Sequence, residues 1–457
     1  MSAVNARAPH PVWGPDATST AVLAGAVAIV WVVAKLVSVW GWVIAPGEYG
    51  DTFYYFTAAQ QAATGGGVAE AMREYPTPAA LLLMLPYELG ATHHDSYRGA
   101  IVWMTSIADA AFALVLGRRL GPVPVLAWVA ITSSLGQLAL LRFDMLPAAV
   151  AGLAVLFAMA GRGGAASALV ALGTGLKIWP IVLMPLTLRH GRLARPAVVL
   201  AGVGTALVAL SIAVGGVGRL LSPLGYQSDR GLQIEAVAAT VPMFTWAHDE
   251  AYQVWYSTFH AFEVLGPGVE LWLRVAQGAS WFGLVACLGL LARWWWNGAP
   301  ASGIGWLAIT LVGTFVVTSR ALSPQYLLWL AAPAVVVLGY AWNAAWRERD
   351  PATPGRAGSA DGPGLAAGAS DGPGEDAPGL VAALVTVAGV LILCALTTAV
   401  YPVYYGGITG RGDTTGHTLL LLALRNVGLL LLVSWSAVCA YFSAPGRTKF
   451  RAGSGVR

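Results

Sequence analysis

Long apolar runs alternate with short polar segments along most of the chain. A helix that crosses a bilayer needs about 20 predominantly apolar residues, within roughly 17–25. Runs of that kind predict membrane helices near residues 20–44, 96–117, 122–141, 144–161, 196–215, 271–292, 301–319, 322–342, 379–400 and 418–442. The pattern therefore predicts an all-α polytopic membrane protein.

A further apolar stretch, residues 163–188, is interrupted by Gly173, Gly175, Lys177 and Pro180. It can form one span or two half-length segments that enter and return. Positive residues in short loops favour the cytoplasm, and only the returning pair puts all the basic loops on that side. We therefore expect a re-entrant pair, whose break faces a cavity, and about 11–12 membrane segments in total.

The same topology divides the chain into five parts. They are a cytoplasmic N-terminus at 1–19, a transmembrane core at 20–345, a cytoplasmic linker at 346–378, a C-terminal transmembrane pair at 379–442 and a basic cytoplasmic tail at 443–457. The linker is rich in Gly, Ala, Pro and Asp, a composition that cannot form a core, so we expect disorder. The external segments are expected at 45–95, 142–144, 216–270 and 401–417, with interfacial helices in the first.

Composition agrees with this topology. The chain is 57% hydrophobic and only 11% charged, whereas ordinary soluble domains are about 25% charged. The net charge of +4 follows from the cytoplasmic loops, so we expect no nucleic-acid partner. The three cysteines fall inside apolar runs and show neither a disulfide framework nor metal spacing. No acidic cluster of metal-binding type occurs, so we expect no metal and no cofactor.

The stretch "APGEYGDTFYYF" places Asp51 directly after the first apolar run and before a cluster of rings that includes Tyr54. Asp is favoured at helix N-caps, so Asp51 can simply begin an interfacial helix whose rings lie at headgroup level. Alternatively, Asp51 can act as a general base in a pocket beside the bilayer. The two interpretations are compatible.

The stretch "REYPTPAALLLMLPYELG" follows in the same external segment and contains Tyr75. Its prolines precede an apolar run too short to span, which predicts a second surface helix. Two such helices would roof a cavity. Simple anchoring at the interface is an equally good interpretation of each residue here.

Ionisable residues within or beside the spans are functional candidates by default. Arg142 and Asp144 share one turn, and we favour a local ion pair over a role in a site. Lys35 and Asp109 fall near mid-span, and we slightly favour a structural pair between them. Lys177 sits at the helix break, where it can bind an anion such as phosphate or extend to the interface.

The external segment 216–270 contains Gln227, Arg230, Glu235 and His260. Arg230 and Glu235 are close enough in sequence to form an ion pair. The amide and imidazole groups are suited to hydrogen-bond sugar hydroxyls, although a lone histidine is more often structural.

The stretch "SRALSPQYLLWL" begins with Arg320 and continues through Gln325 and Tyr326 into an apolar run. It predicts a polar patch that opens a helix, and helix N-termini attract anions. Arg320 and Lys177 are therefore our two candidates for a phosphate. No GxGxxG, Walker or HExxH pattern occurs, so an activated substrate for an external enzyme has to arrive in the bilayer attached to a lipid.

Taken in order, Asp51, "YPTP", "LRFD", "GLKIWP", "YQSDRGLQIE" and "SPQYLLW" resemble glycosyltransferase family 87 of the GT-C class. The resemblance covers about residues 20–345 and departs at "YPTP", where many relatives look like "YPP". It implies an actinobacterial α-mannosyltransferase of the plasma membrane, with polyprenyl-phosphate-mannose as donor and a glycolipid or glycan acceptor. It also implies that an acid in the first external loop, here Asp51, is the base, and that the sugar is transferred with inversion.

Two rival functions remain at this stage. A sister enzyme of the same class could use another lipid-linked sugar, such as decaprenyl-phosphate-arabinose. A transporter or flippase for a lipid-linked saccharide is also compatible with a broken helix near Gly175. Against transport, the two halves show no inverted repeat and the polar residues gather on one face rather than at the midplane.

Overall fold

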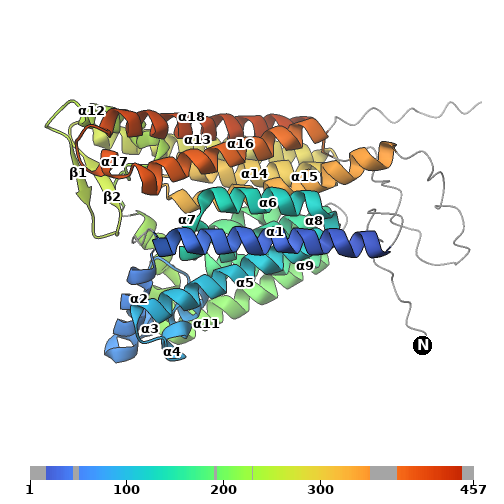
Figure 1. The fold of residues 1–457 in the computed structure, drawn as a ribbon, viewed down its shortest axis with the longest axis horizontal. Coiled ribbons are helices and arrows are strands. Elements are labelled where there is room, and N and C mark those ends of the chain that lie inside the picture. Colours follow the sequence, from blue (N-terminus) through green and yellow to red (C-terminus); the bar gives the residue numbers. More distant parts are fainter. Residues whose placement is uncertain (1–16, 45–50, 190–192, 229, 350–377, 445–457) are drawn as a thin grey trace, which may run out of the picture.

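The computed structural model describes residues 17–44, 51–189, 193–228, 230–349 and 378–444. Most of the expected N-terminal segment, linker and tail lies outside these ranges. The described helices form an elongated bundle (Figure 1), with a small two-stranded sheet at one end.

Eight helices of the described ranges are long and apolar enough to cross a membrane. They are α1 (Ala17–Ile44), α5 (His94–Leu120), α11 (Ala194–Ser228), α13 (Val269–Trp296), α14 (Ala301–Thr318), α15 (Leu327–Arg349), α16 (Leu380–Thr398) and α18 (Thr415–Phe442). Their number and apolarity agree with the multi-pass membrane protein that the hydropathy pattern predicts.

Three shorter apolar helices, α6 (Pro122–Leu135), α8 (Met145–Met159) and α9 (Gly163–Leu176), complete the bundle. The expected single span 122–141 is interrupted at Gly136, whose φ of 53° is readily adopted only by glycine. The chain then restarts as α7 (Gln137–Leu141). The described part of the chain thus has fewer long spans than the 11–12 expected segments.

The bundle core is built around α14 and α15, which are buried over most of their length. A helix that is hydrophobic all round belongs in such a position. Small residues allow close helix packing: a Cβ added to Gly152 would lie 2.7 Å from the ring of Phe112 and 2.8 Å from Ala332. Replacing this glycine would therefore separate three helices.

The segment after α9 returns to the end of the bundle from which α9 starts. It continues through η2 (Trp179–Leu183) and α10 (Met184–Thr187). The Ser167 and Thr187 hydroxyls are 2.8 Å apart, so the two limbs lie side by side, as the re-entrant pair requires. The return limb is no regular half-helix, because Pro180 and Pro185 remove backbone donors.

The basic loops meet at one end of the bundle, which we call the basic end. Asn343 donates to the carbonyl of Leu120 at 3.2 Å, Arg293 to Ala444 at 2.9 Å, and Arg189 to Ala299 at 3.0 Å. These bonds join the ends of helices that are distant in sequence. Arg189 and Arg293 therefore lie at this end, and the side of the membrane that it faces stays a prediction.

The opposite end, which we call the loop end, carries the first long connection (Figure 1). This connection forms α2 (Thr52–Gln61), η1 (Ala62–Gly66), α3 (Gly67–Glu70) and α4 (Thr77–Glu88). The two helices predicted for residues 45–95 are therefore present, as α2 and α4. Their buried faces contribute to a separate apolar cluster that includes Tyr55, Ala59, Leu83 and Met84.

The segment 216–270 is more structured than expected. The helix α11 continues past a kink at Gly215 and Gly216, and the chain then forms η3 (Val237–Ala239), α12 (Thr240–Trp246) and an antiparallel hairpin of β1 (Gln253–Tyr256) and β2 (Phe262–Leu265). The chain before α18 packs beside this hairpin, through η5 (Ala399–Val403) and α17 (Gly406–Thr409). At the far end, α15 runs to Arg349, so residues 346–349 of the expected linker are helical.

Candidate functional site

Asp51 occupies the N-cap position of α2, but its side chain does not cap the helix. Its backbone carbonyl accepts the first helical bond, from Tyr55 N at 2.9 Å. Its Oδ2 lies 2.5 Å from Arg142 Nη1 and accepts a bond from the Tyr55 hydroxyl at 3.3 Å. Asp51 therefore starts the helix, as the local sequence predicts, while its carboxylate faces other functional groups.

Arg142 is not paired with Asp144, so the predicted local ion pair is wrong. The backbone at Arg142 is extended, and the guanidinium contacts Asp51 and Tyr401 instead. Its Nη2 donates to the Tyr401 hydroxyl at 3.5 Å, and its charge lies 5.8 Å from the centre of that ring. Arg142 thus joins the first loop to the segment that follows α16.

Asp144 is fully buried and pairs with Lys177. Its Oδ1 accepts from Lys177 Nζ at 2.7 Å and from Trp329 Nε1 at 2.9 Å. The ammonium also lies 5.1–5.6 Å from the centres of three rings, those of Tyr75, Tyr326 and Trp329. A buried charge needs such partners, and the role of Lys177 as a phosphate ligand stays a prediction.

Two tyrosines connect these ion pairs. The hydroxyls of Tyr55 and Tyr75 are 2.9 Å apart; Tyr55 contacts Asp51, and the Tyr75 ring faces Lys177. Burial raises the pKa of both hydroxyls well above the ordinary value, so both stay protonated. We call Asp51, Arg142, Asp144 and Lys177 the charged cluster.

Lys35 and Asp109 pair with each other, as predicted. Lys35 Nζ lies 2.9 Å from Asp109 Oδ2, which also accepts from Trp31 Nε1 at 2.8 Å. Trp128 donates to the other carboxylate oxygen. The pair joins α1, α5 and α6 within the bundle, which is a structural arrangement.

The predicted ion pair between Arg230 and Glu235 is wrong. Arg230 donates to the carbonyl of Phe259 at 3.2 Å, whereas Glu235 is buried opposite Arg425 of α18 at 3.7 Å. Burial raises the pKa of Glu235 to about 7, against the opposing effect of Arg425. The segment that contains Glu235 packs beneath α18, and this tertiary contact decides the pairing.

Four further residues were predicted from the sequence outside these ion pairs: Arg320, Gln325, Tyr326 and Gln227. Arg320 donates to the carbonyl of Arg230 at 3.2 Å and its own carbonyl accepts from Gln233 at 3.0 Å. Gln325 and Tyr326 are buried in η4 (Pro324–Tyr326), where the Tyr326 ring stacks on Trp329. The side chain of Gln227 falls outside the described residues.

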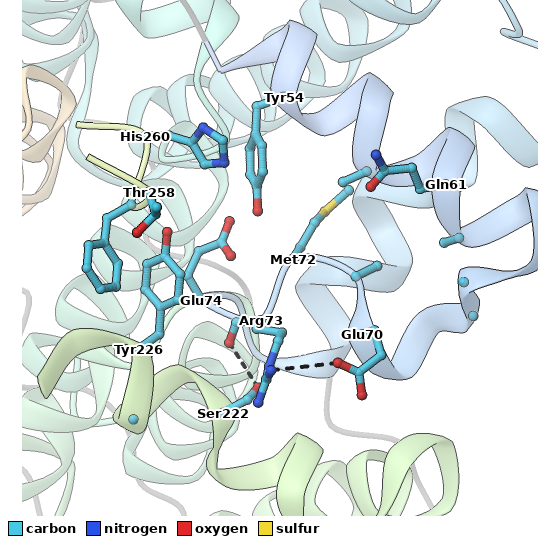
Figure 2. Close-up of a pocket in the computed structure, with 17 residues that line it drawn as sticks. Tyr54, Gln61, Glu70, Met72, Arg73, Glu74, Ser222, Tyr226, Thr258 and His260 are labelled. Atoms are coloured by element: carbon cyan, nitrogen blue, oxygen red, sulfur yellow. Dashed lines mark hydrogen bonds and ion pairs between the residues drawn. The ribbon is translucent and has the colours of Figure 1, made fainter. Parts of the chain in front are cut away.

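A pocket of about 540 Å³ opens at the loop end, between the first loop, the end of α11 and the hairpin turn (Figure 2). Tyr54 and His260, both predicted from the sequence, line it with their ring centres 4.7 Å apart. The complete lining is Tyr54, Ala58, Gln61, Ala62, Gly66, Gly67, Glu70, Ala71, Met72, Arg73, Glu74, Ser222, Gly225, Tyr226, Thr258, Phe259 and His260. The charged cluster is absent from this lining, so Lys177 and Arg320 do not face the pocket.

Glu74 was not among the site residues predicted from the sequence, and neither were Tyr226 and Thr258 of the same lining. Figure 2 shows the Tyr54 hydroxyl pointing toward the Glu74 carboxylate, and the two share a hydrogen bond. Burial raises the pKa of Glu74, while the bond from Tyr54 opposes that shift. The sequence could have suggested Glu74, because this acid directly precedes the predicted Tyr75 in "REYPTP".

Neighbouring residues of the first loop contact either the pocket or the charged cluster. Tyr54 and Glu74 line the pocket, whereas Tyr55 and Tyr75 contact the charged cluster. The pocket and the cluster are therefore neighbours that share α2 and the chain before α4. Within the described ranges, no group of three or more His, Cys, Asp or Glu side chains is arranged to hold a metal ion.

Comparisons with protein-family models, with curated proteins and with solved structures gave no significant match. The function is therefore argued from the geometry of the loop end.

Proposed function

We propose that the chain is a membrane glycosyltransferase of the GT-C class, similar to family 87. It transfers a mannosyl residue from a polyprenyl-phosphate-sugar to a glycolipid or glycan acceptor. The basic end faces the cytoplasm, in accordance with the preference of positive loops, and the loop end faces outward. The re-entrant pair and the interfacial helices of the first loop belong to this proposed architecture.

The ion pair between Asp51 and Arg142 is the observation that carries the proposal. The two residues come from different loops, yet Oδ2 and Nη1 are 2.5 Å apart. Transfer from a lipid phosphate needs a base for the acceptor hydroxyl and a cation for the leaving group. This pair provides both at the loop end, and the side chains are only partly exposed, at 30% for Asp51 and 12% for Arg142.

The proposed step is a single displacement at the anomeric carbon. The acceptor oxygen forms a bond to that carbon as the bond to the phosphate oxygen breaks, and the bonding electrons leave with the phosphate. Asp51 takes the hydroxyl proton, and the transition state resembles an oxocarbenium ion. One displacement inverts the configuration, so a β-linked donor gives an α-linked product.

Arg142 has a second role in this step. A donor phosphate beside the guanidinium replaces Asp51 as its anionic partner, which frees the carboxylate to accept a proton. Lys177 and Arg320 are retained as further phosphate candidates. Each is already engaged, Lys177 by Asp144 and Arg320 by the carbonyl of Arg230, so donor binding has to displace those contacts.

The decisive experiment is transfer from radiolabelled polyprenyl-phosphate-mannose to extracted envelope lipids by the purified full-length protein. Asp51→Asn is expected to lower transfer at least about 100-fold while donor binding is retained. Asp95→Asn is the matched control, because this acid belongs to the same loop end but its side chain is 86% exposed. Normal turnover by Asp51→Asn would remove this residue from the mechanism.

The same assay separates the rivals. Transfer from polyprenyl-phosphate-arabinose in place of the mannose donor would indicate a pentosyltransferase. Movement of a lipid-linked saccharide across proteoliposomes, without any transfer and without sensitivity to Asp51→Asn, would indicate a transporter.

A further inference from the structure

The pocket at the loop end has the size and lining of a ligand site. Its volume of about 540 Å³ falls within the roughly 300–1,000 Å³ of typical small-molecule pockets. Two pairs of rings line it: Tyr54 lies next to His260 (Figure 2), and the ring of Tyr226 contacts that of Phe259. Ring faces of this kind can pack against the C–H faces of a sugar.

The polar groups of the pocket favour a neutral ligand rich in hydroxyls. The Glu74 carboxylate is paired with the Tyr54 hydroxyl, and a carboxylate accepts hydrogen bonds from hydroxyl donors. The same carboxylate repels anions, and Arg73, the cation of the lining, is paired with Glu70, so the pocket favours a neutral ligand over a lipid phosphate. Tyr226, Thr258 and Gln61 add further hydrogen-bonding groups to the wall.

The charged groups at the rim differ from Glu74 in their exposure. Arg73 Nη1 lies 3.7 Å from Glu70 Oε2, and these side chains are 62% and 74% exposed. The backbone of Arg73 is held by the Ser222 hydroxyl at 2.9 Å. Glu70 and Glu74 both line the pocket, but Glu70 is exposed whereas Glu74 is half-buried and bonded to Tyr54.

We propose that this pocket binds the carbohydrate head of the acceptor. Glu74 and Tyr54 bind sugar hydroxyls, and Tyr226 and Phe259 pack against the sugar face. This inference rests on the proposed glycosyl transfer, because only a transferase needs an acceptor site beside Asp51. The shared α2 places the bound sugar next to Asp51, so Glu74 acts as a positioning residue and Asp51 as the base.

Steady-state transfer provides the first test, with octyl α-mannoside as the acceptor probe. Removal of a hydrogen bond to a charged group costs about 1.5–3 kcal/mol, which corresponds to roughly 10–150-fold. Glu74→Gln is therefore expected to raise the acceptor KM at least about tenfold, with kcat and the donor KM close to those of the native protein. Asp95→Asn, at a residue outside the pocket lining, is expected to behave as the native protein does.

Direct binding provides a second test that needs no transfer. Saturation-transfer NMR on the purified full-length protein should detect α-mannobiose with the native protein and with Asp51→Asn, and a much weaker signal with Glu74→Gln. Tyr226→Leu removes one ring from the wall and gives an independent variant if Glu74→Gln fails to fold. Arabinobiose and glucobiose are measured in parallel, because the proposal does not specify which sugar the acceptor carries.

The outcomes separate the two proposals. Saccharide binding that depends on Glu74, without any transfer, supports the pocket and rejects the glycosyltransferase. Transfer with an unchanged acceptor KM in both Glu74→Gln and Tyr226→Leu overturns the pocket assignment while the proposed function stands. Failure of all three disaccharides to bind the native protein also overturns it.

Discussion

Arg142 Nη2 donates a hydrogen bond to the hydroxyl of Tyr401, which lies 259 positions later in the sequence, at 3.5 Å. The Tyr401 ring in turn packs edge-on against Tyr405 at 4.6 Å. The segment between α16 and α18 therefore supports the guanidinium that holds Asp51. This segment lies outside the core predicted at residues 20–345, yet it contacts the charged cluster through Tyr401.

Tyr401→Phe removes the hydroxyl and keeps the ring. One intramolecular hydrogen bond contributes about 0.5–1.5 kcal/mol, so transfer should fall roughly 2–10-fold. Tyr404→Phe is the control, because Tyr404 packs against His417 rather than Arg142. Equal kcat/KM in the two variants would show that the bond to Arg142 has no effect on the reaction.

Asp144→Asn should destabilise the fold. The substitution leaves the Lys177 ammonium, whose side chain is 19% exposed, without its anionic partner, and breaking a buried ion pair costs about 3–5 kcal/mol. Thermal unfolding of the purified protein in detergent measures the loss. Adding Lys177→Gln should restore part of it, and a double variant less stable than Asp144→Asn would contradict this explanation.

Asp109→Asn should reduce stability without changing the chemistry. Asp109 is fully buried and accepts bonds from Lys35, Trp31 and Trp128, so the change leaves Lys35 uncompensated. We expect a loss of about 3 kcal/mol or more and an unchanged acceptor KM in the folded fraction. A changed KM with normal unfolding would instead place this pair in the site.

Acceptor binding should weaken as the pH falls. Because burial raises the pKa of Glu74 above 4.5, the carboxylate is lost at a higher pH than in an exposed glutamate. The acceptor KM should rise as the pH falls through that raised value, and Glu74→Gln should show no such rise. The ionisable groups that interact with Glu74 are Tyr54, Tyr75, Tyr226, Asp51, Arg219 and Arg230.

Two further points check this pH dependence. His260 also lines the pocket, where its ring contacts Tyr54, so His260→Gln is the control and should retain the rise in KM. For folding, the raised pKa acts in one direction: the contribution of Glu74 to stability is fully present below 4.5 and is lost as the pH rises through the folded-state value. If Glu74→Gln removed a loss of stability that the native protein shows at low pH, this direction would be wrong.

The sequence by itself determined the features that depend on local composition. Hydropathy gave the membrane character, because each apolar run can bury its backbone polar groups only as a helix in lipid. Lys177 and Pro180 marked the broken segment correctly, because α9 ends at Leu176 and η2 follows; Gly173 and Gly175 did not, since the helix runs through both. Asp51 could be singled out as a candidate because its position directly after the first apolar run is visible in the local sequence.

Only the tertiary structure decided which side chains meet. Arg142 and Asp144 are neighbours in sequence, yet their partners Asp51 and Lys177 come from other segments. Likewise Glu235 pairs with Arg425 rather than with the nearby Arg230. An ion pair forms where helix packing brings charges together in a dry interior, and neither spacing nor hydropathy along the chain records that packing. For the same reason, the pocket and its Glu74 emerged only when the first loop, α11 and the hairpin turn were placed side by side.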